Sequence, residues 1–376
     1  MSARSLLLHH PAGAFFTIAA LIACMFPWIW TLPFESATSV HLHLHLHLHL
    51  RLGLFGFGAA AVTGYVLTAL PAWNPRPLPV SVMILASAFL LGRGLALVFP
   101  DQLAAPLVVS SGIGLLICTH ALRGAQISRL PIAAAPLILA LAEAGLIAGL
   151  IPASWVALFM AGLILFVGGR AIPAFIVTEA ARHGRALAPP GPLWLPFALI
   201  LATMALEGMP ALGSAGLLSA SILWRLRHAT GAGLANLLLA GAWGSLAVTL
   251  PLLLLADIHA RIAVEHVFLI MTMGGTIFAF AGRAAMGRPA AGGLAPHPLQ
   301  LAGFALILLA APLRALSAFM SDDLGLILSG LAWSAGWLAF LACHLRALTL
   351  PTPFPVLSAT REAPGHRPGP QARQQE

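Results

Sequence analysis

The chain has 376 residues, of which 60% are hydrophobic and only 8% are charged. A soluble domain carries about 25% charged residues, so this composition excludes a water-soluble globule. The 19 basic residues are all arginines, scattered without the basic face of a nucleic-acid-binding protein, so nucleic acid is excluded as a partner. The three cysteines lie in apolar segments without a CxxC pair, which argues against a zinc ribbon, a redox dithiol and covalently attached c-type haem.

Apolar runs long enough to cross a membrane recur along the whole chain. A helix needs roughly 20 apolar residues to span a bilayer core, so these runs predict an all-α, polytopic transmembrane helix bundle surrounded by lipid. We expect about twelve spans, at 14–34, 53–72, 78–99, 103–120, 131–150, 153–172, 193–212, 214–224, 232–256, 263–282, 298–316 and 324–345. The eighth is short, and with the seventh it could form a kinked or re-entrant unit around Pro210 and Gly213.

The arginines orient this bundle. With a cytoplasmic N-terminus and twelve crossings, the outer side receives four of the 19 arginines, namely Arg51, Arg93, Arg261 and Arg314. An excess of arginine on the inner side follows the positive-inside rule. We therefore predict that both termini are cytoplasmic and that residues 1–350 form the transmembrane domain. Residues 351–376, rich in Pro, Arg, Gln and Gly, are predicted to be a disordered cytoplasmic tail.

A histidine tract precedes the second predicted span. From His41 to His49, five histidines alternate with leucine. In a strand all five would share one face, and in a helix His41, His45 and His49 would stack, so either arrangement could bind a transition metal through imidazole. Strict alternation is also typical of a low-complexity expansion in an outer loop, and we favour that interpretation of the tract as a whole.

Ionisable residues at membrane depth are costly, so each is a candidate site residue. His49 and His266 lie at the outer ends of their spans, where both could point into the bundle, although a membrane histidine is more often a packing residue than a ligand. Glu143 stands alone in the middle of the fifth span, without a second carboxylate at helical spacing. It would stay protonated, hydrogen-bond a neighbouring helix or take part in a proton relay.

Four segments of the chain carry a family resemblance. They are LFGFGAAAVTGYVLTALPAW at 54–73, LLGRG at 90–94, VGGRAIPAF at 167–175 and EHVFLIMTMGGTIFAFAGRAAMGR at 265–288. In this order they resemble the NnrS family of polytopic membrane proteins that contain haem and copper. Members of that family are associated with the response to nitric oxide in denitrifying bacteria.

The sequence departs from the family pattern at several histidines. In the place of the family's HAHEM motif, His49 matches the first histidine, Arg51 replaces the second and Leu52 replaces the glutamate. His266 keeps the histidine of the tenth span, whereas Arg288 and Leu238 stand where the family usually has histidine. Histidines are the natural ligands of non-covalent haem and of copper. The chain has therefore lost a metal, moved its ligands into the histidine tract, or uses a ligand that does not align.

The resemblance implies a multi-pass protein of the bacterial inner membrane that binds haem and copper and responds to nitric oxide and related nitrogen oxides. The cofactor site is then expected in the outer half of the bundle, with His49 and His266 as metal ligands. Arg51, Arg93 and Glu265 would line the same site, and the arginines would pair with haem propionates. No catalytic motif is present, so we name no catalytic residue.

Two other functions fit parts of the sequence. Twelve spans with cytoplasmic termini are common in secondary transporters of small molecules or ions, although the loop NPRPLP lacks the Gly-x-x-x-Asp-Arg signature of the major facilitator group. A subunit of a haem-copper oxidase or nitric oxide reductase would need a cluster of histidines on several facing helices. Here only His120, His266 and His344 lie within spans, so this count falls short.

Overall fold

Long apolar runs form helices throughout the residues that the computed structural model describes, which are 6–31, 48–99, 103–124, 127–188, 191–289, 292–320, 323–353 and 355–357. In these residues no strand forms, and the only β-type pairs are two isolated bridges, Leu6 with Pro351 and Gly287 with Ala295. The prediction of an all-α protein is confirmed for this part of the chain. His41, His45 and the tail from 358 lie outside the described residues.

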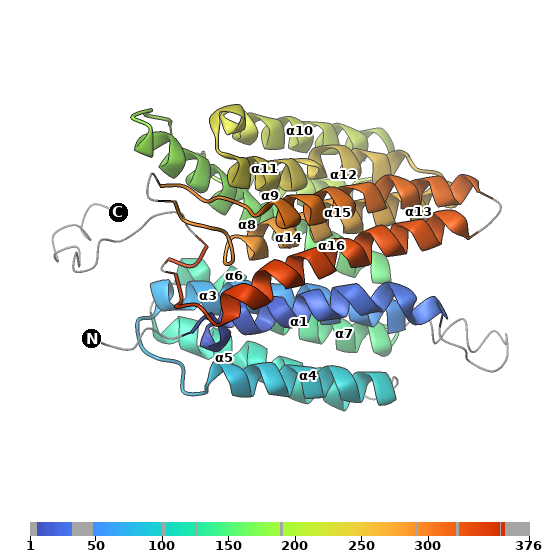
Figure 1. Ribbon diagram of the computed structural model, residues 1–376. Helices are drawn as coiled ribbons and strands as arrows, with labels where there is room; N and C mark the ends of the chain where they lie inside the picture. Colours follow the sequence, from blue (N-terminus) through green and yellow to red (C-terminus); the bar gives the residue numbers. More distant parts are fainter. Residues whose placement is uncertain are drawn as a thin grey trace, which may run out of the picture.

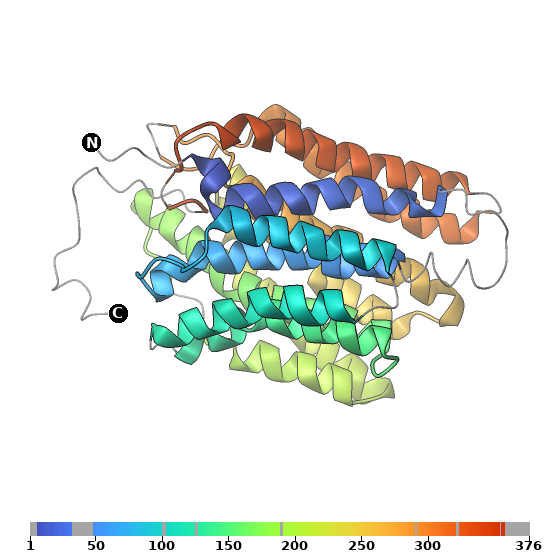
Figure 2. The same ribbon diagram turned by 90° about the horizontal axis from the view of Figure 1, so that it is seen from below.

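The first half of the chain supplies the helices on one side of the bundle (Figures 1 and 2). In chain order they are α1 (Pro11–Met25), η2 (Phe26–Thr31), the π-helix η3 (Arg51–Gly58), α3 (Ala59–Trp73), α4 (Val82–Val98), the π-helix η4 (Ala105–Ser110), α5 (Ser111–Arg123), α6 (Leu130–Ala133) and α7 (Ala135–Ile147). The short 3-10 turns η1 (Leu7–His9) and η5 (Ile127–Arg129) precede α1 and α6.

The second half supplies the remaining helices. They are α8 (Ala153–Arg182), α9 (Trp194–Ala205), α10 (Gly208–Leu226), α11 (Leu234–Gly244), α12 (Leu246–Leu255), α13 (Ile258–Val267), the π-helix η7 (Phe268–Gly274), α14 (Gly275–Gly282), α15 (Pro298–Leu316) and α16 (Leu324–Leu348). The 3-10 turns η6 (Ala229–Gly231) and η8 (Ser317–Phe319) follow α10 and α15. The last helix, α16, packs against both α15 and α1 and so joins the two ends of the chain.

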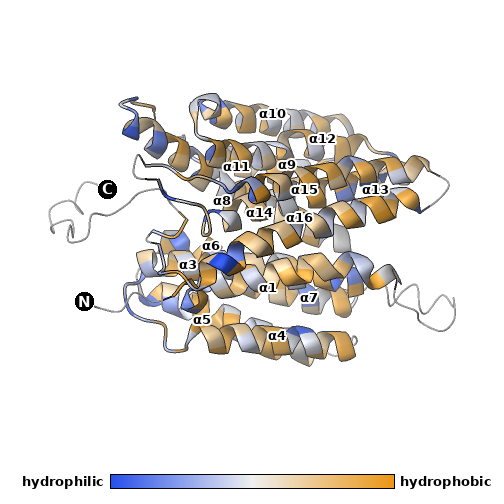
Figure 3. Ribbon diagram, in the orientation of Figure 1, coloured by the Kyte–Doolittle hydropathy of each residue, from blue (hydrophilic) through white to orange (hydrophobic). Residues whose placement is uncertain are grey.

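The helices have the length and composition of membrane spans. Within the described residues, seven helical segments are long and apolar enough to cross a bilayer, and four shorter apolar helices accompany them. Hydrophobic residues cover most of the length of the helices, whereas hydrophilic residues gather mainly at helix ends and in loops (Figure 3). This distribution is what a lipid environment selects, because backbone polar groups are satisfied inside each helix and apolar side chains face the hydrocarbon.

One predicted boundary is wrong. The break between the seventh and eighth predicted spans lies at Leu206 and Glu207, not around Pro210 and Gly213. Gly208 has a φ of 61°, a left-handed conformation that glycine adopts without strain. Pro210 then falls in the first turn of α10, where its missing N–H costs no intrahelical hydrogen bond. The eighth helix is accordingly longer than predicted.

Aromatic packing joins the two halves, and a close glycine contact holds helices together within the second half. Phe57 of η3 lies 5.0 Å from Trp337 of α16, and Phe278 of α14 lies 5.3 Å from the same ring, measured between ring centroids. A Cβ at Gly168 of α8 would collide with the indole of Trp243, whose Nε1 donates to the Ile164 carbonyl over 3.0 Å. Gly168 is therefore the small residue that lets α11 approach α8.

Candidate functional site

A buried ion triad joins three helices of the first half. Arg51, the first residue of η3, donates from Nε to Glu143 Oε1 over 3.1 Å. Arg93 of α4 donates from Nη1 to the same oxygen over 2.9 Å, and its Nη2 lies 2.8 Å from Oε2. The three residues are 3%, 4% and 1% exposed, respectively. Two guanidinium groups thus share one carboxylate, which leaves one formal positive charge inside the bundle.

Polar and aromatic neighbours orient Arg93 in this triad. Its Nη2 donates to the Ser110 hydroxyl over 2.9 Å, and its guanidinium carbon lies 5.6 Å from the centroid of the Phe89 ring, within reach of a cation–π interaction. A cavity of about 10 Å³ adjoins Glu143, Thr63 and Ser110, which is close to the minimum that a single water molecule needs. The triad is therefore well held but has little space for a larger guest.

The two predicted metal-ligating histidines lie side by side. His49 stands just before η3, and His266 is the penultimate residue of α13; their ring centroids are 6.1 Å apart with an interplanar angle of 31°. Phe26 of η2 packs against His49 at 5.2 Å between centroids. His266 Nδ1 lies 2.8 Å from the Ile262 carbonyl oxygen. Since a carbonyl only accepts, Nδ1 carries the proton and Nε2 keeps its lone pair for a metal or a donor.

The fifth predicted site residue does not join either group. Glu265 is one-third exposed and pairs with Arg261, one helical turn earlier, at 3.4 Å between Arg261 Nε and Glu265 Oε1. Arg261 is itself more than half exposed, so this is a surface ion pair of the kind that contributes little to stability. The five residues predicted to line one site are thus divided into a histidine pair, two arginines of an ion triad and one surface carboxylate.

Sequence reasoning missed the partners of Glu143. A hydrogen bond from Glu143 to a neighbouring helix was one of the alternatives, and the structure identifies the partners as Arg51 of η3 and Arg93 of α4. The signal was available in physical terms, because an acid in the middle of a span needs a partner, and Arg93 is a basic residue inside a predicted span. Ser110 was missed as well, and no pattern in the sequence indicates its role.

Three π-helical segments adjoin the histidine pair and the ion triad. Arg51 opens η3, Ser110 closes η4, and η7 begins two residues after His266. Single-turn π-helical insertions are rare and frequent at functional sites, because the extra residue per turn re-aims the neighbouring side chains. The local geometry therefore marks the same end of the bundle that the histidines and arginines occupy.

The histidine pair has the spacing of a shared ligand site. Two imidazoles that bind one metal ion would have ring centroids no more than about 6 Å apart, since each metal–nitrogen bond is about 2 Å long. The described residues contain no group of three or more histidine, cysteine, aspartate or glutamate side chains that could hold a metal. His344 serves packing instead, because its ring stacks on Phe340 at 5.0 Å and its Nε2 lies 3.3 Å from the Gly13 carbonyl oxygen.

A second polar cluster lies around Arg283, at the C-terminal end of α14. Arg283 is 1% exposed and donates to Asn236 Oδ1 over 2.7 Å and to the Leu357 carbonyl over 2.6 Å. Its guanidinium carbon also lies 4.0 Å from the centroid of the Phe175 ring. Burial lowers the pKa of Arg283 to about 9, so the guanidinium stays charged at neutral pH. This cluster ties the segment 355–357 to the bundle.

A family model matches residues 7–351, which is nearly the whole described chain, and its description is NnrS protein. The chain belongs to the NnrS family. Comparison with curated proteins gives no match. The family resemblance of the four sequence segments is thereby confirmed.

The NnrS segments converge in the structure. Segment 54–73 forms most of η3 and α3, 90–94 lies in α4, 167–175 lies in α8, and 265–288 runs from the end of α13 through η7 and α14. Helix α14 contacts α3, and η7 contacts α8. The segments that identify the family therefore pack against one another and carry Arg93 and His266, whereas His49 and Arg51 lie just before the first of them.

Proposed function

We propose that this NnrS family member binds haem or copper through His49 and His266 and takes part in the response to nitric oxide and related nitrogen oxides. The observation that carries the proposal is the histidine pair, with ring centroids 6.1 Å apart and Nε2 of His266 oriented as an acceptor by the Ile262 carbonyl. Two such imidazoles fit one metal ion or one haem iron. When bound, such a centre would supply a metal that can bind nitric oxide.

The ion triad supports an anionic group near the same end of the bundle. Arg51 and Arg93 share the single carboxylate of Glu143 and retain one formal positive charge. Guanidinium groups form charge-assisted pairs with carboxylates, so a haem propionate near this end of the bundle would have suitable partners. Arg51 is only two residues from His49 along the chain, so a cofactor held by the histidine could reach the guanidinium.

We further propose a twelve-span topology with both termini in the cytoplasm of a bacterial cell, in the inner membrane. The seven long helical segments, the four shorter apolar helices and α10 agree with the predicted order of spans. Leu7 N donates to the Leu350 carbonyl over 3.1 Å, so the two ends of the described chain meet at one end of the bundle. An even number of crossings has this consequence, and the arginine distribution then assigns that end to the cytoplasm.

The proposal is tested by optical spectra and metal analysis of the purified protein. We expect wild type to show haem absorbance or bound copper, and His49→Ala and His266→Ala each to lose it. His183→Ala, which changes an exposed histidine after α8, is the matched control and should keep the wild-type load.

Three outcomes would contradict the proposal. Wild type that neither contains nor takes up haem or copper would refute metal binding. Loss of the metal only on deletion of 41–47 would assign the ligands to the histidine tract. Substrate uptake into proteoliposomes without any metal would favour a transporter.

A further inference from the structure

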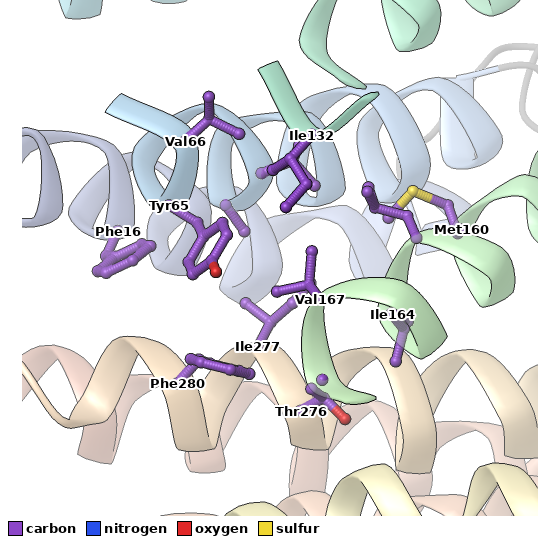
Figure 4. A pocket seen from close by; sticks show the side chains of 14 residues that line it. Phe16, Tyr65, Val66, Ile132, Met160, Ile164, Val167, Thr276, Ile277 and Phe280 are labelled. Atoms are coloured by element: carbon purple, nitrogen blue, oxygen red, sulfur yellow. The ribbon is translucent and has the colours of Figure 1, made fainter. Parts of the chain in front are cut away.

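A cavity of about 70 Å³ lies where α1, α3 and α6 meet α8 and α14 (Figure 4). Among the side chains that surround it are Tyr65, Met160, Val167, Ile277 and Phe280, and Figure 4 shows them coming from facing helices. Three of the four NnrS segments, 54–73, 167–175 and 265–288, contribute to its wall. Neither the histidine pair nor the ion triad lines it, so it is a separate feature of the bundle.

The wall is almost entirely apolar. Of the fourteen lining side chains only Tyr65 and Thr276 carry a hydroxyl. A buried water molecule requires two to four polar partners, so a cavity with such a wall stays dry and accepts apolar guests. Tyr65 also packs edge-on against Phe280 at 5.7 Å between centroids, which adds a stable aromatic side to the wall.

The volume limits the guest to a few atoms. A cavity needs roughly 10–15 Å³ to hold one water molecule, and an engineered apolar cavity of about 150 Å³ accepts benzene or xenon. The present volume of about 70 Å³ lies between these values. It therefore suits a guest of two or three atoms, or one xenon atom, and is too small for a lipid chain or a drug-sized ligand.

Two helical segments connect the cavity with the histidine pair. Phe26 packs on His49 and Phe16 lines the cavity, ten residues back along the same N-terminal helical segment. Thr276 lines the cavity ten residues after His266, on the continuous helical path of α13, η7 and α14. At a rise of 1.5 Å per residue, both helices place the cavity roughly 15 Å from the pair.

We propose that this cavity binds a small apolar gas molecule of two or three atoms and holds it inside the membrane on the way to the histidine pair. Apolar gases are more soluble in hydrocarbon than in water, so a dry cavity in a bilayer-embedded bundle receives them at a raised local concentration. The small volume of the cavity and its apolar lining determine this class of guest. Its identity as nitric oxide rests on the proposed function.

Xenon tests the cavity directly, because it is a heavy apolar atom of suitable size. In crystals of the full-length protein pressurised with xenon, we expect an anomalous-scattering peak inside the cavity. Ala61→Leu adds three carbon atoms to a buried wall position and should abolish this peak. Ala305→Leu makes the same change at an exposed position of α15 and should leave it intact.

A second variant covers the case in which Ala61→Leu fails to fold. Ile277→Ala removes wall atoms and should enlarge the cavity, so we expect a stronger xenon peak at lower pressure. No peak in the wild-type cavity, an ordered water hydrogen-bonded to Thr276 in its place, or a peak unaffected by Ala61→Leu would each overturn the proposal. Xenon binding requires no metal, so its failure is distinguishable from failure of the haem and copper proposal.

Discussion

Replacing Glu143 by glutamine removes the one carboxylate that Arg51 and Arg93 share in the described part of the bundle. Glutamine has nearly the same shape, so the change leaves packing intact and isolates the effect of charge. Breaking a buried ion pair on one side costs about 3–5 kcal/mol, because the remaining charges stay buried without compensation. Glu143 is 1% exposed and serves two guanidinium groups, so we expect a loss within or above this range.

Thermal unfolding of the protein in lipid nanodiscs would measure this loss. A change of this size lowers the midpoint by roughly 5–10 °C, at about 2 °C per kcal/mol for a large chain. Glu265→Gln is the matched control, since it changes a one-third exposed carboxylate that pairs only with Arg261, and it should remain within about 0.5 kcal/mol of wild type. A triple variant with Arg51→Met, Arg93→Met and Glu143→Leu should recover stability, because apolar residues of similar volume leave no buried charge.

Unfolding of Glu143→Gln at the wild-type temperature would refute the expected loss of stability. That result would mean that the two guanidinium groups find other compensation. If Glu143→Gln loses stability and the triple apolar variant does not regain it, the loss comes from packing or hydrogen bonding and not from buried charge.

Two further predictions concern the packing of the bundle. Gly168→Ala should destabilise the protein by about 1–3 kcal/mol, because the added methyl group meets the Trp243 ring. Gly162→Ala on the same helix places its methyl group in open space and should be neutral or stabilising. Thermal unfolding of the two variants side by side measures the difference. Arg283→Ala should release the segment that ends at Leu357, which hydrogen exchange would detect as faster amide exchange there; unchanged exchange would show that other contacts hold it.

The positions of the helices followed from the sequence because hydrophobicity along the chain is a local property. The predicted span 298–316 coincides with α15, and the span at 324–345 ends three residues before α16 does. The predicted kink around Pro210 and Gly213 is wrong, because a proline in the first turn of a helix is tolerated and α10 continues through both residues. The π-helical segments were not predicted either, since nothing in the local composition of 51–58 or 268–274 distinguishes them from α-helix.

The candidate site was accessible from the sequence only as a set of residue types. The cost of ionisable groups in a membrane singled out His49, His266, Arg51, Arg93 and Glu143 one by one. Which of them meet depends on the packing of helices that are far apart in the chain. Arg51 and Glu143 are separated by 92 positions, and no pattern in either segment points to the other.

The sequence by itself determined that this chain is a membrane-embedded helical protein, because its charge content and apolar runs leave no other way to satisfy the backbone and the side chains. It also determined membership of the NnrS family through four segments in order. Tertiary structure alone decided that Arg51 and Arg93 share Glu143, that His49 faces His266 and that Glu265 turns to the surface. These contacts depend on helix rotation and crossing, which distant packing such as that of Trp243 on Gly168 fixes and local sequence does not encode.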